Sequence, residues 1–229
     1  MAPGARFSFN ETTGERNEAK GFEEAPVIIN GELQTGLGGG ICQVSTTVFN
    51  AVYEAGLQID ERTNHALYIS HYPLGRDATV NYPDLDLKFR NDTGDWMVVL
   101  GASGSNGIAI TLAGTPTGRR VVSEAGPLVV TGKPPEKRVK DPKLTVGTEV
   151  VEELGSSPQS VSVTRTVYNQ DGSVLYEETW RTNYRGEKRV IRVGTKKKVE
   201  EPKPPTTSTP TTTTPTTTTK PPAPPPPKP

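Results

Sequence analysis

The chain has 229 residues and a formal net charge of zero, and only 32% of its residues are hydrophobic. This length suffices for two domains of modest size. The chain contains no run of eighteen apolar residues and no apolar segment at its start, so we expect neither a transmembrane segment nor a signal peptide in it. Cys42 is the only cysteine, which excludes a disulfide framework and a multi-cysteine metal site. We expect no metal and no cofactor.

The charge is divided unevenly along the chain. Residues 1–118 carry 7 Lys and Arg against 14 Asp and Glu, whereas residues 119–200 carry 16 against 11. This change of sign predicts two modules with a boundary near residue 118. The basic module shows neither an Arg-rich helix nor a nucleic-acid-binding motif, so nucleic acid is not an expected partner.

The first module begins with irregular structure. Residues 1–35 contain short extended pieces, among them a strand-like segment at 25–29 that precedes an Asn-Gly turn. Residues 36–40 are too rich in glycine for a regular element. The next segment, 41–55, has apolar residues at helical spacing, and Gly56 stands where a left-handed residue would end a helix. We predict one main helix here, directly after the glycine-rich loop.

The rest of the first module reads as β structure. Residues 67–72 have strand composition, and residues 79–89 alternate loosely between polar and apolar types. Segments 96–102 and 108–112 flank a Ser-Gly-Ser-Asn-Gly stretch, which predicts a hairpin. The predicted fold of residues 1–118 is therefore α+β.

The second module has no helical periodicity. Segments 160–168 and 173–180 alternate around an Asn-Gln-Asp-Gly turn and predict a second hairpin, and residues 189–193 predict a final strand. Residues 133–143 read as extended and solvated. We predict an elongated all-β domain over 119–195.

The C-terminal tail, residues 196–229, has a biased composition. Its last 29 residues hold 12 of the 22 prolines and 11 threonines. This composition predicts a disordered, semi-extended spacer.

One segment has the composition of a reactive site. Gly38, Gly39 and Gly40 precede Cys42, which places a thiol at the junction of a glycine loop and a helix N-terminus. The free N–H groups and dipole of a helix N-terminus stabilise a thiolate, the form that attacks carbonyl groups. The glycine N–H groups could also form an oxyanion hole. The alternative is a small buried hydrophobic cysteine packed beneath the helix.

A nucleophilic thiol needs a base, and the chain has only two histidines. We choose His65, at the start of the strand-like run, and expect His71 to be a polar-face or supporting residue. Asp77 could orient the imidazole. Arg76 could bind a substrate carboxylate, although ordinary ion pairs explain Asp77 and Arg76 equally well. The remaining substrate-binding candidates flank the nucleophile and the base, namely Gln43 and Asn64.

Five stretches in order resemble the VanW-like family, over about residues 3–113. They are residues 3–10, 38–47 (GGGICQVSTT), 62–65 (RTNH), 73–80 (PLGRDATV) and 86–91 (DLKFRN). The one departure is Ala66, where the family pattern has a serine. Members are usually longer at the N-terminus, so we expect this chain to be part of a longer envelope protein. Some members of the family are associated with L,D-transpeptidation of peptidoglycan through the cysteine of this motif. The resemblance therefore implies this role for Cys42.

Residues 119–195 resemble a G5 domain, an elongated β module thought to bind amino-sugar polymers. The matching residues are 144–147 (LTVG), Gly155, 171–172 (DG) and 190–194 (VIRVG), and Ser157 or Pro158 stands where another glycine belongs.

Together, these features predict a bacterial cell-wall protein of extracytoplasmic location. The leading hypothesis is a cysteine acyltransferase that acts on peptidoglycan stem peptides, with peptidoglycan and anionic wall polymers as partners. The alternative is a non-catalytic peptidoglycan-binding or adhesin-like protein.

Overall fold

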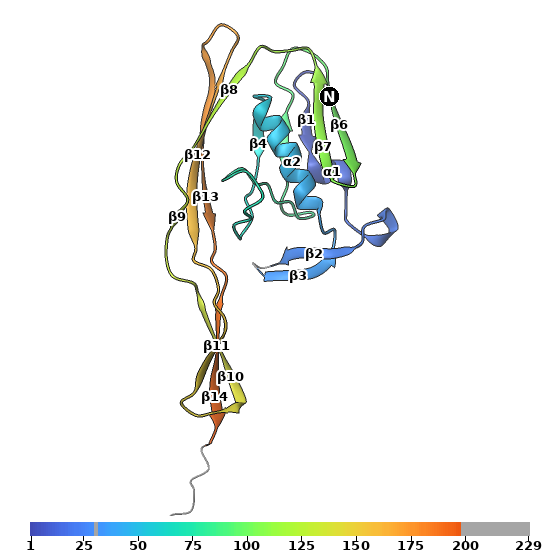
Figure 1. Cartoon of the computed structure of the whole chain (residues 1–229). Helices are drawn as coiled ribbons and strands as arrows, with labels where there is room; N and C mark the ends of the chain where they lie inside the picture. The colour runs from blue at the N-terminus through green and yellow to red at the C-terminus, as the bar shows by residue number, and fades with distance from the viewer. Residues whose placement is uncertain (30–31, 198–229) are drawn as a thin grey trace, which may run out of the picture. The chain divides into compact units, whose positions relative to one another are not determined.

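The computed structural model describes residues 1–29 and 32–197 (Figure 1). Within them, residues 1–196 form one compact unit. No helix of these residues is long and apolar enough to cross a membrane. The predicted Pro/Thr-rich spacer lies almost entirely outside the described residues. The predicted division at residue 118 stays a prediction.

The first part of the unit combines helices with short antiparallel sheets (Figure 1). A three-stranded sheet has the order β1-β5-β4, and two hairpins pair β2 with β3 and β6 with β7. A 3-10 turn, η1, follows the first helix. The elements are β1 (Arg6–Ser8), α1 (Phe9–Thr13), η1 (Glu18–Lys20), β2 (Glu24–Ile29), β3 (Glu32–Leu37), α2 (Ile41–Glu54), β4 (Gln58–Glu61), β5 (Lys88–Arg90), β6 (Met97–Gly104) and β7 (Gly107–Gly114).

Helix α2 is the centre of the core. Its buried face carries Val48, Phe49, Val52 and Tyr53, none of them more than 4% exposed. Such burial contributes about 1.5–3 kcal/mol for each large apolar side chain. Gly56 follows the helix with a φ of 69°, as the sequence predicted.

The described residues of the second part form strands joined by loops, without a helix. One sheet has the order β13-β12-β8, with β9 also paired to β12, and the other has the order β10-β14-β11. The elements are β8 (Arg120–Ala125), β9 (Val129–Val130), β10 (Glu136–Thr145), β11 (Glu149–Glu153), β12 (Gln159–Tyr168), β13 (Val174–Tyr184) and β14 (Arg189–Lys196). The predicted main helix is present as α2, and residues 120–196 form strands without a helix, which agrees with the all-β structure predicted for this region.

Strands β12 and β13 contact the helix side of the first part. Trp180 packs against the rings of Phe49 and Tyr53, with centroids 6.4 and 5.6 Å away. The Arg165 side chain is fully buried and donates a 2.9 Å hydrogen bond to the carbonyl of Leu57. The two predicted modules therefore share one core.

Several local predictions were wrong. Residues 67–72 form no strand, because no strand pairs with them and the Tyr72 N–H closes a turn onto Ile69. The charged segment 133–143 is extended and mostly exposed, as predicted, but its pairing in strand β10 with the parallel strand β14 was not predicted. Residues 9–13, expected to be irregular, form α1, and β3 extends to Leu37, into the glycine-rich stretch.

Candidate active site

The glycine loop sets the start of α2. Gly40 is the N-cap residue with a φ of 85°, a left-handed conformation that favours glycine. A Cβ at Gly39 would lie 2.1 Å from the Cβ of Ala25, so only glycine lets the loop pass β2. The N–H groups of Ile41 and Gln43 donate to loop carbonyls at 3.2 and 3.0 Å.

Cys42 is the second residue of α2 and is only partly buried. Its Sγ lies 3.5 Å from the Thr79 hydroxyl and 3.8 Å from the carbonyl oxygen of Val80. The Cys42 N–H has no hydrogen-bond partner among the described residues. This N–H remains free to serve in the predicted oxyanion hole.

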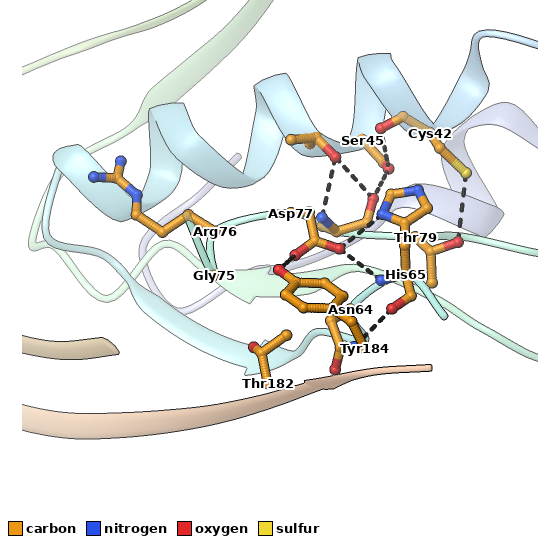
Figure 2. A network of polar contacts seen from close by, with 12 residues as sticks. Cys42, Ser45, Asn64, His65, Gly75, Arg76, Asp77, Thr79, Thr182 and Tyr184 are labelled. Atoms are coloured by element: carbon orange, nitrogen blue, oxygen red, sulfur yellow. Dashed lines mark hydrogen bonds and ion pairs between the residues drawn. The ribbon is translucent and has the colours of Figure 1, made fainter. Parts of the chain in front are cut away.

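His65 lies beside Cys42 and is held by Asp77 (Figure 2). The Nδ1 atom of His65 is 2.8 Å from Oδ2 of Asp77, and the His65 backbone N–H donates to the same oxygen at 2.6 Å. Both residues are buried, at 4% and 3% exposure. Two bonds to one carboxylate oxygen fix the ring and leave its other nitrogen to act on the thiol.

Two further residues hold Asp77, and the sequence analysis assigned neither of them this role. The guanidinium of Arg62 donates to Asp77 Oδ1 at 3.2 Å, and the Tyr184 hydroxyl donates to the same oxygen at 2.8 Å. Arg62 belongs to the RTNH stretch at residues 62–65, and this was the one sequence signal that could have pointed to it. Tyr184 comes from β13, so the second part of the chain contributes directly to this network (Figure 2).

The polar face of α2 positions the segment that carries Asp77. The hydroxyls of Ser45 and Thr46 both donate to the carbonyl of Ala78, and Thr46 also accepts a hydrogen bond from the Ala78 N–H at 3.0 Å. These two residues follow Cys42 in the stretch GGGICQVSTT. The same helical turn therefore fixes the thiol and the chain that orients its base.

The network shifts three pKa values. Burial acts to raise the pKa of Asp77, but the hydrogen bonds from His65 and the charge of Arg62 outweigh it and lower the pKa. Burial acts to lower the pKa of His65, but hydrogen bonds with Asp77 and Cys42 raise it to about 9. Burial also opposes the Cys42 thiolate, yet hydrogen bonds from His65 and Thr79 lower the thiol pKa. These shifts favour the Asp77 carboxylate, the His65 imidazolium and the Cys42 thiolate.

The other candidate residues lie around this centre or away from it. Gln43 is exposed. Asn64 donates to the carbonyls of His65 and Asn183, at 2.8 and 3.3 Å. Arg76 bonds to Asn50 and Glu54 and stacks on Tyr53, the ordinary ion pair that the sequence left open. The exposed His71 touches the ring of Tyr72, which in turn stacks on His65.

Two aromatic residues of the second part contact the first part of the unit. Tyr184 is 4% exposed and bonds to Asp77, and Trp180 packs against α2.

Known proteins resemble this chain mainly over its first half. Residues 1–113 match the family described as VanW like protein. The chain is 44% identical over 110 residues to the uncharacterized protein YoaR of Bacillus subtilis, an alignment that covers 48% of this chain and 36% of the relative. It is 33% identical over 100 residues to the vancomycin B-type resistance protein VanW of Enterococcus faecalis, covering 41% and 36%. The chain thus spans about a third of the length of these relatives.

Two solved structures are similar to a smaller part of the chain. The G5 domain of HP0197 is 27% identical and covers 33% of this chain and 92% of its own, with a TM-score of 0.19. The G5 domain of an IgA1 protease is 19% identical and covers 34% of this chain and 93% of its own, with a TM-score of 0.24.

The family match over residues 1–113 includes Cys42, His65 and Asp77, which lie in the sequence stretches that indicated the resemblance. Residues 1–113 are therefore a VanW-like domain, as those stretches indicated.

Proposed function

We propose that this chain is a cysteine acyltransferase that acts on the stem peptides of peptidoglycan. The observation that carries the proposal is the arrangement of His65, which is fixed by Asp77 on one side and lies beside Cys42 on the other (Figure 2). This is the nucleophile, base and orienting carboxylate expected of acyl transfer.

The proposed chemistry uses the Cys42 thiolate as nucleophile and the His65 imidazolium as proton donor. The Cys42 thiolate attacks a peptide carbonyl carbon, and the developing oxyanion is stabilised by the Cys42 N–H at the helix start. The carbon–sulfur bond forms, the carbon–nitrogen bond breaks, and the His65 imidazolium gives its proton to the leaving amine. An acceptor amine then attacks the thioester, His65 removes its proton, and the carbon–sulfur bond breaks to release the thiolate. Asp77 keeps its charge throughout and stabilises the imidazolium.

The wall is proposed as the place of action for three reasons. A VanW-like domain occupies residues 1–113, and one relative is a vancomycin B-type resistance protein. Residues 119–200, which include the G5-like segment, carry five more basic than acidic residues. This excess favours contact with anionic wall polymers. We therefore place the protein outside the cytoplasm, with peptidoglycan as its partner.

Mass spectrometry of the intact protein tests this function. The chain is incubated with defined muropeptides, with Cys42→Ser as the matched control. We expect an acyl adduct on Cys42 in the wild type that the variant lacks. Retention of muropeptide without an adduct, equal in both proteins, would favour the alternative of a non-catalytic wall-binding protein.

A further inference from the structure

Arg16 lies against the glycine loop that precedes Cys42. A Cβ at Gly38 would come within 3.2 Å of Arg16 Cβ and 3.3 Å of its Cγ, so the stem of this side chain packs on the loop. The Arg16 side chain is therefore anchored on the loop that leads into α2.

The guanidinium of Arg16 has no acceptor. Its three nitrogens, Nε, Nη1 and Nη2, are buried, and none has a hydrogen-bond partner among the described residues. A buried charged group without hydrogen bonds is costly and rare, because its water shell is lost and nothing replaces it. Its only partners there are two ring faces, those of Phe9 at 5.7 Å and Tyr82 at 5.9 Å from the central carbon.

The nearest acidic group does not satisfy Arg16. Asp86 is close enough for its charge to act on Arg16, but the two form no ion pair. The Asp86 carboxylate instead accepts from the Ser8 hydroxyl at 2.6 Å and from the N–H groups of Asn10 and Leu87 at 2.9 and 2.8 Å. The guanidinium therefore keeps its donors for another anion.

The unpaired charge of Arg16 also interacts electrostatically with Cys42. Burial lowers the pKa of Arg16, whereas the charges of Asp86 and the Cys42 thiolate act in the opposite direction. The charges of Arg16 and of the Cys42 thiolate therefore attract each other. Tyr82, whose ring lies on the guanidinium, is 45% exposed and forms the solvent side of this arrangement.

We propose that Arg16 binds a carboxylate of the peptide that reacts with Cys42. The planar guanidinium matches a carboxylate with two parallel hydrogen bonds, and an incoming carboxylate would displace the exposed ring of Tyr82. The substrate is then a peptide with a free carboxylate near the bond that Cys42 attacks. This proposal rests on the proposed function, since it takes Cys42 as the reacting atom.

Arg76, the arginine chosen from sequence for this role, provides the matched control. It already bonds to Asn50 and Glu54. A change at Arg76 therefore alters a satisfied ion pair, whereas a change at Arg16 removes an unsatisfied charge.

The test compares two alkylating agents on the full chain. Iodoacetate carries a carboxylate and iodoacetamide does not, so the ratio of their rates with Cys42 reports an anion site and cancels the intrinsic reactivity of the thiol. We expect the ratio to exceed that of glutathione, and Arg16→Gln to lower it by up to about five-fold, the effect of one charge pair. Arg16→Lys should retain part of the preference, and Arg76→Gln should leave the ratio unchanged.

A second measurement protects the test against a misfolded variant. In the wild type, N-acetyl-D-alanine should slow labelling by iodoacetamide more than its methylamide does. Equal ratios in wild type and folded Arg16→Gln, or equal protection by the acid and the amide, would overturn the carboxylate site while leaving the proposed function intact. A thiol that reacts with neither agent would instead contradict the proposed function.

Discussion

Replacing Tyr184 by phenylalanine removes one hydroxyl and leaves the ring. That hydroxyl donates a 2.8 Å hydrogen bond to the buried carboxylate of Asp77. A hydrogen bond to a charged group contributes about 1.5–3 kcal/mol to stability. The ring contact with Tyr68, with centroids 5.4 Å apart, is kept. We therefore expect Tyr184→Phe to lower the free energy of unfolding by about 1.5–3 kcal/mol.

The assay is urea denaturation of the full chain at neutral pH, with Tyr68→Phe as the matched control. Tyr68 is 38% exposed, and its hydroxyl has no hydrogen-bond partner among the described residues. A change of less than about 0.5 kcal/mol is expected there. If Tyr184→Phe cost no more than Tyr68→Phe, the hydroxyl from β13 would not stabilise the Asp77 carboxylate and the reasoning would fail.

Three further predictions concern activity and binding. His65→Ala should lower the rate of acyl transfer by roughly 10²–10⁴-fold with the fold retained. His71→Ala should keep its activity in the same muropeptide assay. The reverse result would mean that the base is misassigned. The rate of thioester formation should fall as the pH rises through about 9, because His65, whose pKa is raised to about 9, then loses the proton that the leaving amine needs. A rate–pH profile that still rises above that pH would contradict this. Retention of the full chain on isolated walls should weaken as salt rises, since attraction between charges is screened over about 8 Å at physiological ionic strength; salt-independent retention in a pull-down would exclude the electrostatic account.

The sequence predicted those features that depend on local patterns. The helix beginning at Ile41 has its own periodicity, and the hairpin of β12 and β13 has its own turn. Residues 67–72 have strand composition, but composition alone cannot supply a partner strand. Strand β10 was not predicted, because it has a partner strand but lacks the composition of a strand. Its residues are charged, and only pairing with β14, some fifty residues later, makes them a strand.

The candidate site was partly predictable for the same reason. Cys42 and its glycines are adjacent in sequence, and the small number of histidines narrowed the choice of base to two. The bond from Tyr184 to Asp77 joins residues 107 positions apart, and no local pattern marks it. The unpartnered state of Arg16 is likewise a property of its surroundings in the fold, because any acidic neighbour could have paired with it.

The most direct test of the central claim is the titration of the Cys42 thiol itself. Thiolate absorbance near 240 nm is followed against pH, with Cys42→Ser as the baseline. Hydrogen bonds from His65 and Thr79 lower the thiol pKa, so the wild-type thiol should titrate below the value of a free thiol. His65→Ala should move the transition up toward the value of a free thiol, about 8.5. A wild-type thiol that titrates at or above that value, unaffected by His65→Ala, would contradict the thiolate–imidazolium pair.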